Sequence, residues 1–533
     1  MSARRGAVPL QKAWIRCGLL LVFFASGAEA SVNLPLHHWV YEAIERLTAM
    51  DIIDRAMVVT KPYSRKEAAQ YVARAIRRIR DDKIPLDGRE VLAEPLLDRL
   101  MTELRPELVD LGVLPSVPGT KTGAIRYGAR AQVEADAFSV GHGSGRLREN
   151  SMGQYYANGV QVQADLRAWI ELTDAVALSA DPKFISNQRA LGIGATADNH
   201  NIYMQELNAK FTGGNVTFQV GRSSLWWGPG YHGSLLVTDN PFPRDMLQLG
   251  SEEPFRLPWV FRPLGYWKIQ SFLQRLENNR DFPYAQVFGL RVSYLPANWL
   301  EIGLTRLTQF GGHGRGQSLY DGLLHDYFLI KHEVSGKNKA NEEAMVDFTV
   351  RLPAGLQFYW EIGVEDFVDH PATLLGLYIP QVFHKSTTDL RIEYADTDLE
   401  RRYFSGDSHV WYNHFLYTSG MRLKGLPLGD QIGTDATELF IRTTSYLSDN
   451  LQLGTNLNLQ EREKGQPVHE KKREVALDLT WWLSSQTQIT VGYTYQRITN
   501  PGQITSVTPF VETFAGGVTS TNHFLWTSLA QQF

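Results

Sequence analysis

The pattern of apolar and polar positions changes its period once along the chain, near residue 120. Before that point apolar residues recur every three or four positions, which is typical of amphipathic helices. The first such stripe consists of Val40, Ala43, Ile44 and Leu47. A capping box from Ser64 to Glu67 predicts the start of a second helix, and Pro95 predicts the first turn of a third helix that ends at Pro106. The pattern therefore predicts a small helical region between about residues 35 and 110.

After residue 120 the period is two, which predicts β-strands with one apolar and one polar face. In the first run one parity carries Ile125, Tyr127, Ala129, Ala131, Val133, Ala135 and Ala137. The other parity carries Arg126, Arg130, Gln132, Glu134 and Asp136. On the order of 16 to 18 runs of this kind follow one another, and many are about 9 to 11 residues long, the length of a tilted strand that crosses a bilayer.

Strands of a soluble sandwich alternate in the same way, but three features favour a membrane barrel. The runs have the length of membrane-spanning strands. Aromatic residues stand near the ends of many runs, as in an interfacial girdle; they are Tyr294, Trp299, Tyr394, Trp481 and Trp482. The chain ends in Phe533, with Leu525 and Leu529 on its parity, which resembles the C-terminal signal of bacterial outer-membrane barrels. We therefore predict an all-β transmembrane barrel of about 18 antiparallel strands, with the polar parity facing the lumen.

The N-terminal segment has the composition of a secretory signal peptide. Basic residues precede an apolar run at 17–26, and small residues follow at Ala28 and Ala30. A membrane anchor is the alternative, but a run of about ten residues is too short to cross a bilayer. The sequence thus predicts a signal peptide at 1–30, a periplasmic α-helical domain at 31–117 and an outer-membrane β-barrel at 118–533, in the envelope of a Gram-negative bacterium.

Composition excludes several other classes of protein. The chain has 533 residues with 53 Lys+Arg against 57 Asp+Glu, so it has no basic surplus with which to bind nucleic acid. The content of 43% hydrophobic and 11% aromatic residues excludes general disorder. The only cysteine, Cys17, lies in the predicted signal peptide, so no disulfide scaffold is expected.

One segment stands out as a candidate binding site. Residues 221–235 follow a predicted strand and are dense in glycine and aromatic residues. Paired indole rings stack on sugar faces, while guanidinium, phenol and imidazole groups supply hydrogen bonds. The predicted glycan-binding residues are Arg222, Trp226, Trp227, Tyr231 and His232. The alternative is a rigid constriction, or an inward-folded loop that packs inside the barrel.

The same segment resembles the signature of the capsule assembly Wzi family of outer-membrane proteins. Other stretches resemble that family in the same order, at 341–353 (NEEAMVDFTVRLP), 357–366 (QFYWEIGVED), 412–417 (YNHFLY) and 425–429 (GLPLG). The resemblance implies a barrel of about 18 strands with a periplasmic helical bundle. It also implies a lectin-like protein that helps to retain capsular polysaccharide or exopolysaccharide at the cell surface.

Catalytic and metal-binding signatures are missing from the sequence. His37 and His38 are neighbours rather than ligands spaced along one helix face, and His332 lacks the second histidine of a zinc-protease helix. No nucleophile elbow or phosphate loop is present. Lumen carboxylates are interpreted as a polar wall that pairs with arginines rather than as acid–base pairs. The carboxylates are Glu134, Asp136, Glu361 and Glu365, and the arginines are Arg126, Arg130 and Arg351. We expect no enzyme activity, no metal and no cofactor.

The leading hypothesis is an outer-membrane protein that binds surface polysaccharide and helps to assemble or retain it. The alternative is a porin-like channel for small polar solutes, because 16 to 18 strands can leave an aqueous pore of roughly porin size. The long polar loop at 311–343 either touches glycans or merely covers the mouth of the barrel.

The expected partners are polysaccharide and outer-membrane lipid, and the protein is expected to be a monomer that binds no nucleic acid. The segment at 39–69 resembles an S-layer-homology-like helical unit, which implies contact with a cell-wall polymer. The alternative is a helical plug or brace that packs on the rest of the chain.

Overall fold

The computed structural model describes residues 30–81, 88–115, 125–143, 145–186, 201–328, 340–365, 370–399 and 410–533. The predicted signal peptide lies outside the described residues except for Ala30, so it stays a prediction.

The N-terminal region is helical, as the sequence predicts. Its helices are α2 (Trp39–Ala49), α3 (Arg65–Arg80), α4 (Glu90–Glu103) and α5 (Arg105–Asp110). Ser64 caps α3 by accepting a hydrogen bond from the Glu67 amide at 3.1 Å, as the capping box predicts. The predicted start of the third helix is wrong. Pro95 lies inside α4, because the buried residues Leu92, Leu96 and Leu100 hold that helix in place, and Pro106 begins α5 instead of ending α4.

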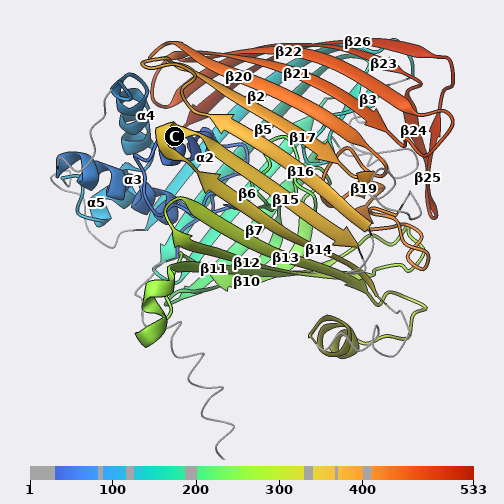
Figure 1. The fold of residues 1–533 in the computed structure, drawn as a ribbon, viewed down its shortest axis with the longest axis horizontal. Coiled ribbons are helices and arrows are strands. Elements are labelled where there is room, and N and C mark those ends of the chain that lie inside the picture. Colours follow the sequence, from blue (N-terminus) through green and yellow to red (C-terminus); the bar gives the residue numbers. More distant parts are fainter. Residues whose placement is uncertain are drawn as a thin grey trace, which may run out of the picture.

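Eighteen strands among the described residues close into an antiparallel barrel, in agreement with the predicted fold (Figure 1). They are β2 (Arg126–Ser139), β5 (Gly159–Thr173), β6 (Val176–Ile185), β7 (Ile202–Gly213), β8 (Val216–Ser223), β10 (Arg244–Ser251), β11 (Tyr266–Arg275), β12 (Gln286–Ala297), β13 (Leu300–Phe310), β14 (Asn341–Arg351), β15 (Gln357–Glu365), β16 (His370–Ile379), β17 (Thr388–Asp396), β20 (Thr437–Ser448), β21 (Leu451–Arg462), β22 (Glu470–Trp482), β23 (Thr487–Thr499) and β26 (Thr519–Gln532). The first and last strands, β2 and β26, pair from Arg130↔Gln532 to Ser139↔His523 and so close the barrel.

The remaining elements are not part of the barrel wall; β1 lies in the helical region and the others lie in the connections between barrel strands. The short strands form four pairs: β1 (Thr60–Lys61) with β9 (Trp226–Trp227), β3 (Gly145–Leu147) with β4 (Tyr155–Ala157), β18 (Arg422–Leu423) with β19 (Leu426–Pro427), and β24 (Gly502–Val507) with β25 (Phe510–Phe514). Short helical turns are η3 (Trp259–Leu264), η4 (Asp321–Phe328) and η5 (Pro353–Gly355).

The two ends of the barrel differ. One end carries the helices α3–α5 and the C-terminus, and the strands are joined there mostly by short turns such as 174–175, 214–215 and 449–450 (Figure 1). We call it the helix end. The opposite end, which we call the loop end, carries the β24–β25 hairpin and the longer connections (Figure 1). No helix among the described residues is long and apolar enough to cross a membrane.

The two faces of the strands carry the two parities, as predicted. On β14 the polar residues Asp347 and Thr349 are buried in the lumen, whereas Val133 of β2 is 49% exposed on the outer surface. The girdle prediction holds for the exposed Trp481 but is wrong for Trp482, which is buried with its ring 4.2 Å from the Arg99 guanidinium carbon. Neighbouring strand residues face opposite sides, so only one tryptophan of this pair can face lipid.

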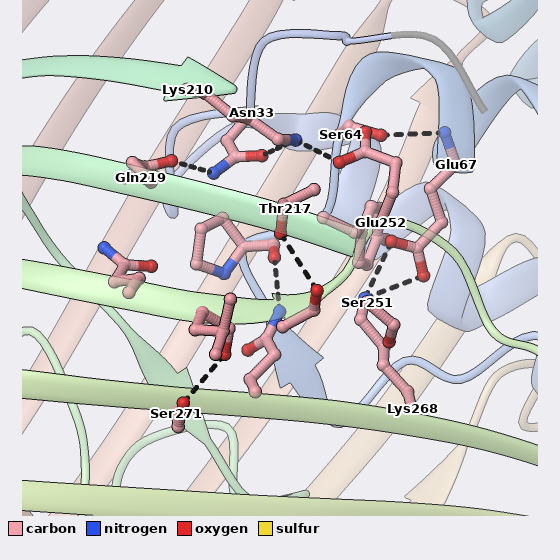
Figure 2. Close-up of a pocket in the computed structure, with 16 residues that line it drawn as sticks. Asn33, Ser64, Glu67, Lys210, Thr217, Gln219, Ser251, Glu252, Lys268 and Ser271 are labelled. Atoms are coloured by element: carbon pink, nitrogen blue, oxygen red, sulfur yellow. Dashed lines mark hydrogen bonds and ion pairs between the residues drawn. The ribbon is translucent and has the colours of Figure 1, made fainter. Parts of the chain in front are cut away.

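The helical region is fastened to the inner wall by buried ion pairs. The Lys268 ammonium of β11 contacts both carboxylate oxygens of Glu67 on α3, at 2.8 and 2.7 Å, and both side chains are 1% exposed (Figure 2). Arg391 of β17 lies 3.1 Å from the Glu45 carboxylate of α2. Because a charge in a dry interior needs an opposite charge, these contacts fix where the helices sit. This arrangement matches the plug or brace that the sequence left open as an alternative.

Backbone pairing adds to this fastening. Thr60 and Lys61 of β1 pair with Trp227 and Trp226 of β9, which belongs to the connection after β8. The Thr60 hydroxyl also lies 2.6 Å from the Ser293 hydroxyl of β12. The helical region, an inward-folded connection and the barrel wall therefore meet at one place in the lumen.

We expect Lys268→Met to destabilise the protein by about 3–5 kcal/mol, because it leaves the Glu67 carboxylate buried without a cation. The double variant Lys268→Met/Glu67→Leu should recover most of that loss. Urea unfolding of the detergent-solubilised protein, followed by tryptophan fluorescence, measures both. In the control Lys471→Met, which removes an exposed ion pair with Glu461, stability should change by less than about 1 kcal/mol. Equal losses of unfolding free energy in Lys268→Met and Lys471→Met would contradict the proposed role of burial.

Candidate functional site

The connection between β8 and β10 folds into the lumen instead of projecting outward. Trp227 is 0% exposed, and its indole Nε1 donates to Gln270 Oε1 at 3.0 Å. Trp226 is 7% exposed, and its Nε1 donates to the Gly230 carbonyl at 3.0 Å. Both indole rings are therefore engaged in packing and hydrogen bonding inside the barrel, as in the inward-folded loop considered from the sequence.

The other predicted glycan-binding residues are split between two faces. Arg222 shares the outward parity of β8 with the exposed Val220 and makes a bidentate ion pair with Asp245, at 2.8 and 3.0 Å. Tyr231 points into the lumen, where its hydroxyl donates to Glu42 Oε1 of α2 at 2.9 Å. The structure thus separates Arg222 from the tryptophans, and a shared role of these residues and His232 in glycan binding stays a prediction.

Two carboxylates of the barrel wall hold the inward-folded connection. Glu361 of β15 accepts hydrogen bonds from the Gly230 amide at 3.0 Å, the Leu235 amide at 2.8 Å and the Ser234 hydroxyl at 3.1 Å. Gly228 has φ +139°, and a Cβ there would lie 2.3 Å from a Glu361 oxygen, so this approach requires glycine. The carboxylate therefore acts as a docking point for peptide N–H groups.

Glu393 of β17 plays the same part for the next residues. It accepts from the Tyr231 amide at 2.6 Å and the His232 amide at 2.7 Å.

Because Glu361 binds peptide amides, the prediction that lumen carboxylates pair with wall arginines is wrong for that residue. Glu134 does pair with an arginine, but with Arg148 of a connection, at 2.7 Å.

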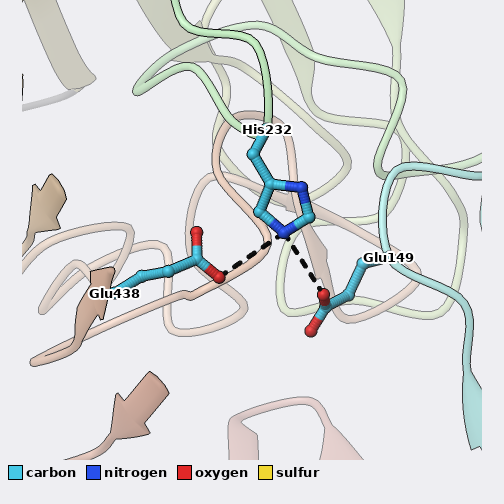
Figure 3. A group of neighbouring side chains, drawn as sticks. All are labelled: Glu149, His232 and Glu438. Atoms are coloured by element: carbon cyan, nitrogen blue, oxygen red, sulfur yellow. Dashed lines mark ion pairs between the residues drawn. The ribbon is translucent and has the colours of Figure 1, made fainter. Parts of the chain in front are cut away.

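A histidine and two carboxylates meet where this connection crosses the lumen (Figure 3). His232 Nε2 lies 3.6 Å from a carboxylate oxygen of Glu149 and 3.6 Å from one of Glu438. The imidazole ring stacks on Phe440 with centroids 3.9 Å apart. Burial disfavours the imidazolium, but Glu438 and Glu149 outweigh it and raise the pKa of His232 to about 9.

The spacing of these three side chains would also suit a divalent cation, since their ligand atoms lie within 4.8 Å of one another. The Lys472 ammonium already contacts Glu149, however. Lys472 and protonated His232 together neutralise the two carboxylates, so the arrangement is explained as an ion network that ties the connection to β20 and β22.

A group of aromatic rings that the sequence did not single out lies at the loop end. We call it the mouth cluster. It consists of Phe282, Tyr284, His313, His414, Phe415 and Tyr417, drawn from three connections. Phe282 and Tyr417 pack edge to face at 5.2 Å, and His414 and Phe415 lie 4.5 Å apart. Phe415 is 73% exposed, so the cluster presents a ring to solvent.

Cations and a neutral imidazole accompany these rings. The guanidinium carbon of Arg275 lies 3.9 Å from the centroid of Tyr284, and that of Arg315 lies 5.3 Å from the centroid of Phe282. Burial, together with nearby Arg315, lowers the pKa of His414 to about 4, so its imidazole is neutral at pH 7. A close approach at Gly312, where a Cβ would lie 2.8 Å from Phe282, brings two of the connections together. Rings, guanidinium groups and a neutral imidazole side by side can stack on sugars and bond their hydroxyls.

The sequence held partial signals for the mouth cluster. The glycine-rich stretch at 311–316 and the aromatic stretch at 412–417 were both visible. The two stretches lie about 100 residues apart in the chain, and they meet only in the folded barrel. The Tyr417 hydroxyl, for example, donates a hydrogen bond to the Gly311 carbonyl at 3.2 Å.

The closed barrel, its apolar outer surface and its polar, plugged lumen define a transmembrane β-barrel of the outer-membrane type. Within that class the chain belongs to the capsule assembly protein Wzi family, whose model matches residues 130–507.

Individual relatives are more distant. An uncharacterized 55.8 kDa protein in the cps region of Klebsiella pneumoniae is 31% identical over 162 residues, and the match covers 28% of this chain and 31% of that protein. This chain therefore matches only about a third of that relative's length. The fold is similar to that of Escherichia coli Wzi, described as an outer membrane protein involved in group 1 capsule assembly and a carbohydrate-binding β-barrel. The TM-score is 0.67 at 16% identity, covering 93% of this chain and 98% of that one.

We expect Glu361→Ala to release the inward-folded connection, because it leaves two buried amides without an acceptor and costs about 2–4 kcal/mol. Hydrogen exchange of residues 228–236, followed by mass spectrometry, should accelerate strongly. Glu361→Gln, which keeps one acceptor oxygen, should show a smaller increase. The control Glu461→Gln changes a carboxylate that is 41% exposed and should leave exchange unaltered; an equal increase there would count against the docking role of Glu361.

We expect protonated His232 to stabilise the fold in a pH-dependent way. Its folded pKa of about 9 is raised above the ordinary value of 6.5. The contribution, about 2–3 kcal/mol, is therefore complete below about pH 6.5 and is lost as the pH rises through about 9. The difference in unfolding free energy between the wild type and His232→Gln, measured at pH 6 and pH 10, should shrink at pH 10. The exposed His142→Gln serves as control, and a difference that stays constant with pH would refute the ion network.

Proposed function

We propose that this chain is a non-catalytic outer-membrane protein that binds surface polysaccharide through the mouth cluster and helps to assemble or retain capsule or exopolysaccharide. The observation that carries the proposal is the gathering of partly exposed rings from three connections, beside Arg275 and Arg315, at the loop end of the barrel. Such a surface offers stacking and hydrogen bonding to a polymer that is too long to enter the lumen.

The comparisons support this proposal. The family is named for capsule assembly, the Klebsiella relative is described by its cps region, and the Escherichia coli protein with a similar fold is described as carbohydrate-binding. Because proteins of one fold can have different functions, the function has to be inferred from the residues of the site. The mouth cluster supplies that site in this chain.

The proposal includes an orientation. The helix end, with the helical domain predicted at 31–117, faces the periplasm, and the loop end of the barrel predicted at 118–533 faces the outside. The short turns at the helix end support this orientation, because outer-membrane barrels have short periplasmic turns and longer external loops. A monomer in outer-membrane lipid is part of the same proposal, and contact of the helical region with a cell-wall polymer stays a prediction.

The porin-like channel has less support. The helix α2, the strand β1 and the connection after β8 lie in the lumen, and buried ion pairs such as Lys268–Glu67 hold the helical region against the wall. We expect a silent barrel in planar-bilayer recordings, whereas a steady open pore would favour transport.

We expect Phe415→Ala and Tyr284→Ala each to weaken binding of the purified protein to capsular polysaccharide by about 1–2 kcal/mol, roughly 5- to 30-fold in Kd. Binding to immobilised polysaccharide from the producing strain measures this. In cells, the same variants should lower the attached polysaccharide while synthesis and release continue.

Two matched variants sharpen this test. Trp259→Ala changes a ring that is 88% exposed at the helix end and should leave binding unchanged. Trp226→Ala changes the buried segment that the sequence singled out. If Trp226→Ala reduces binding in a correctly folded protein and Phe415→Ala does not, the mouth cluster is the wrong site.

A further inference from the structure

The helix α2, the strand β1 and the connection after β8, which together we call the plug, do not fill the lumen evenly. Against the wall formed by β23, β26, β2, β5, β6 and β7 there is a cavity of about 370 Å³, within the range of roughly 300–1,000 Å³ that ligand pockets occupy. Residues 35–38 of the helical region border it on one side and residues 148–154 of the connection after β2 on another. We call this cavity the chamber.

Buried polar atoms without partners border the chamber. Gln154 is 6% exposed, and its amide Nε2 has no hydrogen-bond partner among the residues that the structure describes. Asp181 is 5% exposed, and its Oδ1 has none either. A buried polar atom left without a partner costs free energy, so such atoms mark a place where a polar ligand or water is held.

The charges that line the chamber balance one another. Arg148 pairs with Glu134 at 2.7 Å, and Arg167 pairs with Glu206 at 2.7 Å. The cations that remain in the lining, Arg130 and Lys183, are matched in number by two carboxylates, Asp165 and Asp181. A strongly charged ligand would upset this balance, and an apolar ligand would leave the polar atoms without partners.

The rest of the lining suits a hydroxylated ligand. Five glutamine amides face the chamber, each able to donate and to accept; they are Gln132, Gln154, Gln163, Gln205 and Gln488. The half-buried Trp526 contributes an indole ring, which lies so close to Gly492 that a Cβ there would be 2.2 Å from it. Sugar hydroxyls also donate and accept, and a pyranose ring stacks on an indole.

The chamber continues toward the helix end. A second cavity of about 20 Å³ shares Arg130, Gln488 and Ala530 with it and reaches Ser485 and Gln486 in the turn between β22 and β23. On the loop-end side the connection that contains Gln154 borders the chamber. The described cavities therefore run from the chamber toward the helix end, and we take this as the direction of entry.

We propose that the chamber is a second saccharide site, separate from the mouth cluster, which takes one or two neutral sugar units from the helix end. The site stands on its own lining. Only the statement that it faces the periplasm rests on the proposed function. A barrel with both sites would contact sugar on both sides of the outer membrane.

The test uses the full mature chain in detergent, with glucose, galactose, mannose and maltose as probes, followed by saturation-transfer-difference NMR. We expect at least one probe to give signals. Ser528→Trp, which places a bulky ring in the chamber wall, should abolish them, and Gln154→Ala should weaken binding about tenfold. Phe415→Ala should leave them intact while it weakens polysaccharide binding, so that failure of one site is distinguishable from failure of the other.

A second measurement keeps the test decisive if Ser528→Trp does not fold. The single cysteine in the sequence, Cys17, lies in the predicted signal peptide. In the mature chain Ser528→Cys therefore gives a unique thiol. Its reaction with a small methanethiosulfonate reagent should slow at least fivefold when the bound sugar is present. A maleimide adduct on Gln486→Cys should block the sugar signals by closing the access route.

Three outcomes would overturn the proposal. No signal with any probe would mean that the chamber holds water alone. Signals that survive Ser528→Trp but vanish in Phe415→Ala would place the sugars at the mouth cluster. Thiol reactivity that is indifferent to sugar would show that the chamber is not the binding site.

Discussion

Each polar side chain that a strand turns away from lipid needs a partner inside the barrel, and this requirement organises the whole molecule. Lipid cannot solvate charges, so the polar parity of the 18 strands faces inward. Inside, unpaired charges would be costly unless water or protein meets them. The helical region meets Lys268 with Glu67 and Arg391 with Glu45, while the connection after β8 brings peptide N–H groups to Glu361 and Glu393.

The same requirement explains why the tryptophan-rich segment lies where it does. Once Gly230, Tyr231, His232 and Leu235 bind wall carboxylates through their amides, the neighbouring indoles are carried into the lumen and buried. Their residue types suit sugar binding, but their position suits packing. The exposed rings at the loop end, such as Phe415, belong to the other connections that form the mouth cluster.

The plug therefore acts as a scaffold inside the barrel. It occupies much of the lumen and leaves the loop end as the surface that carries the mouth cluster, which fits a protein that holds a polymer rather than one that conducts solutes. Where the plug does not reach the wall, a polar chamber remains, and some of its buried polar atoms lack partners within the described part of the chain. The position of the plug, the exposed mouth cluster and the polar chamber all follow from how the charged side chains of the lumen find their partners.

The sequence by itself determined the barrel, its approximate strand number, the helical region and the family resemblance, because a period of two or of 3.6 is written locally. It misplaced the start of α4 at Pro95, since burial of leucines outweighs one missing backbone hydrogen bond. It assigned Trp482 to lipid, because residue type does not reveal which face a strand turns inward. Only the tertiary structure decided that Trp227 donates to Gln270 and that Phe282 packs against the connection that contains Phe415. These contacts join segments that are distant in the chain, so no local pattern in the sequence predicts them.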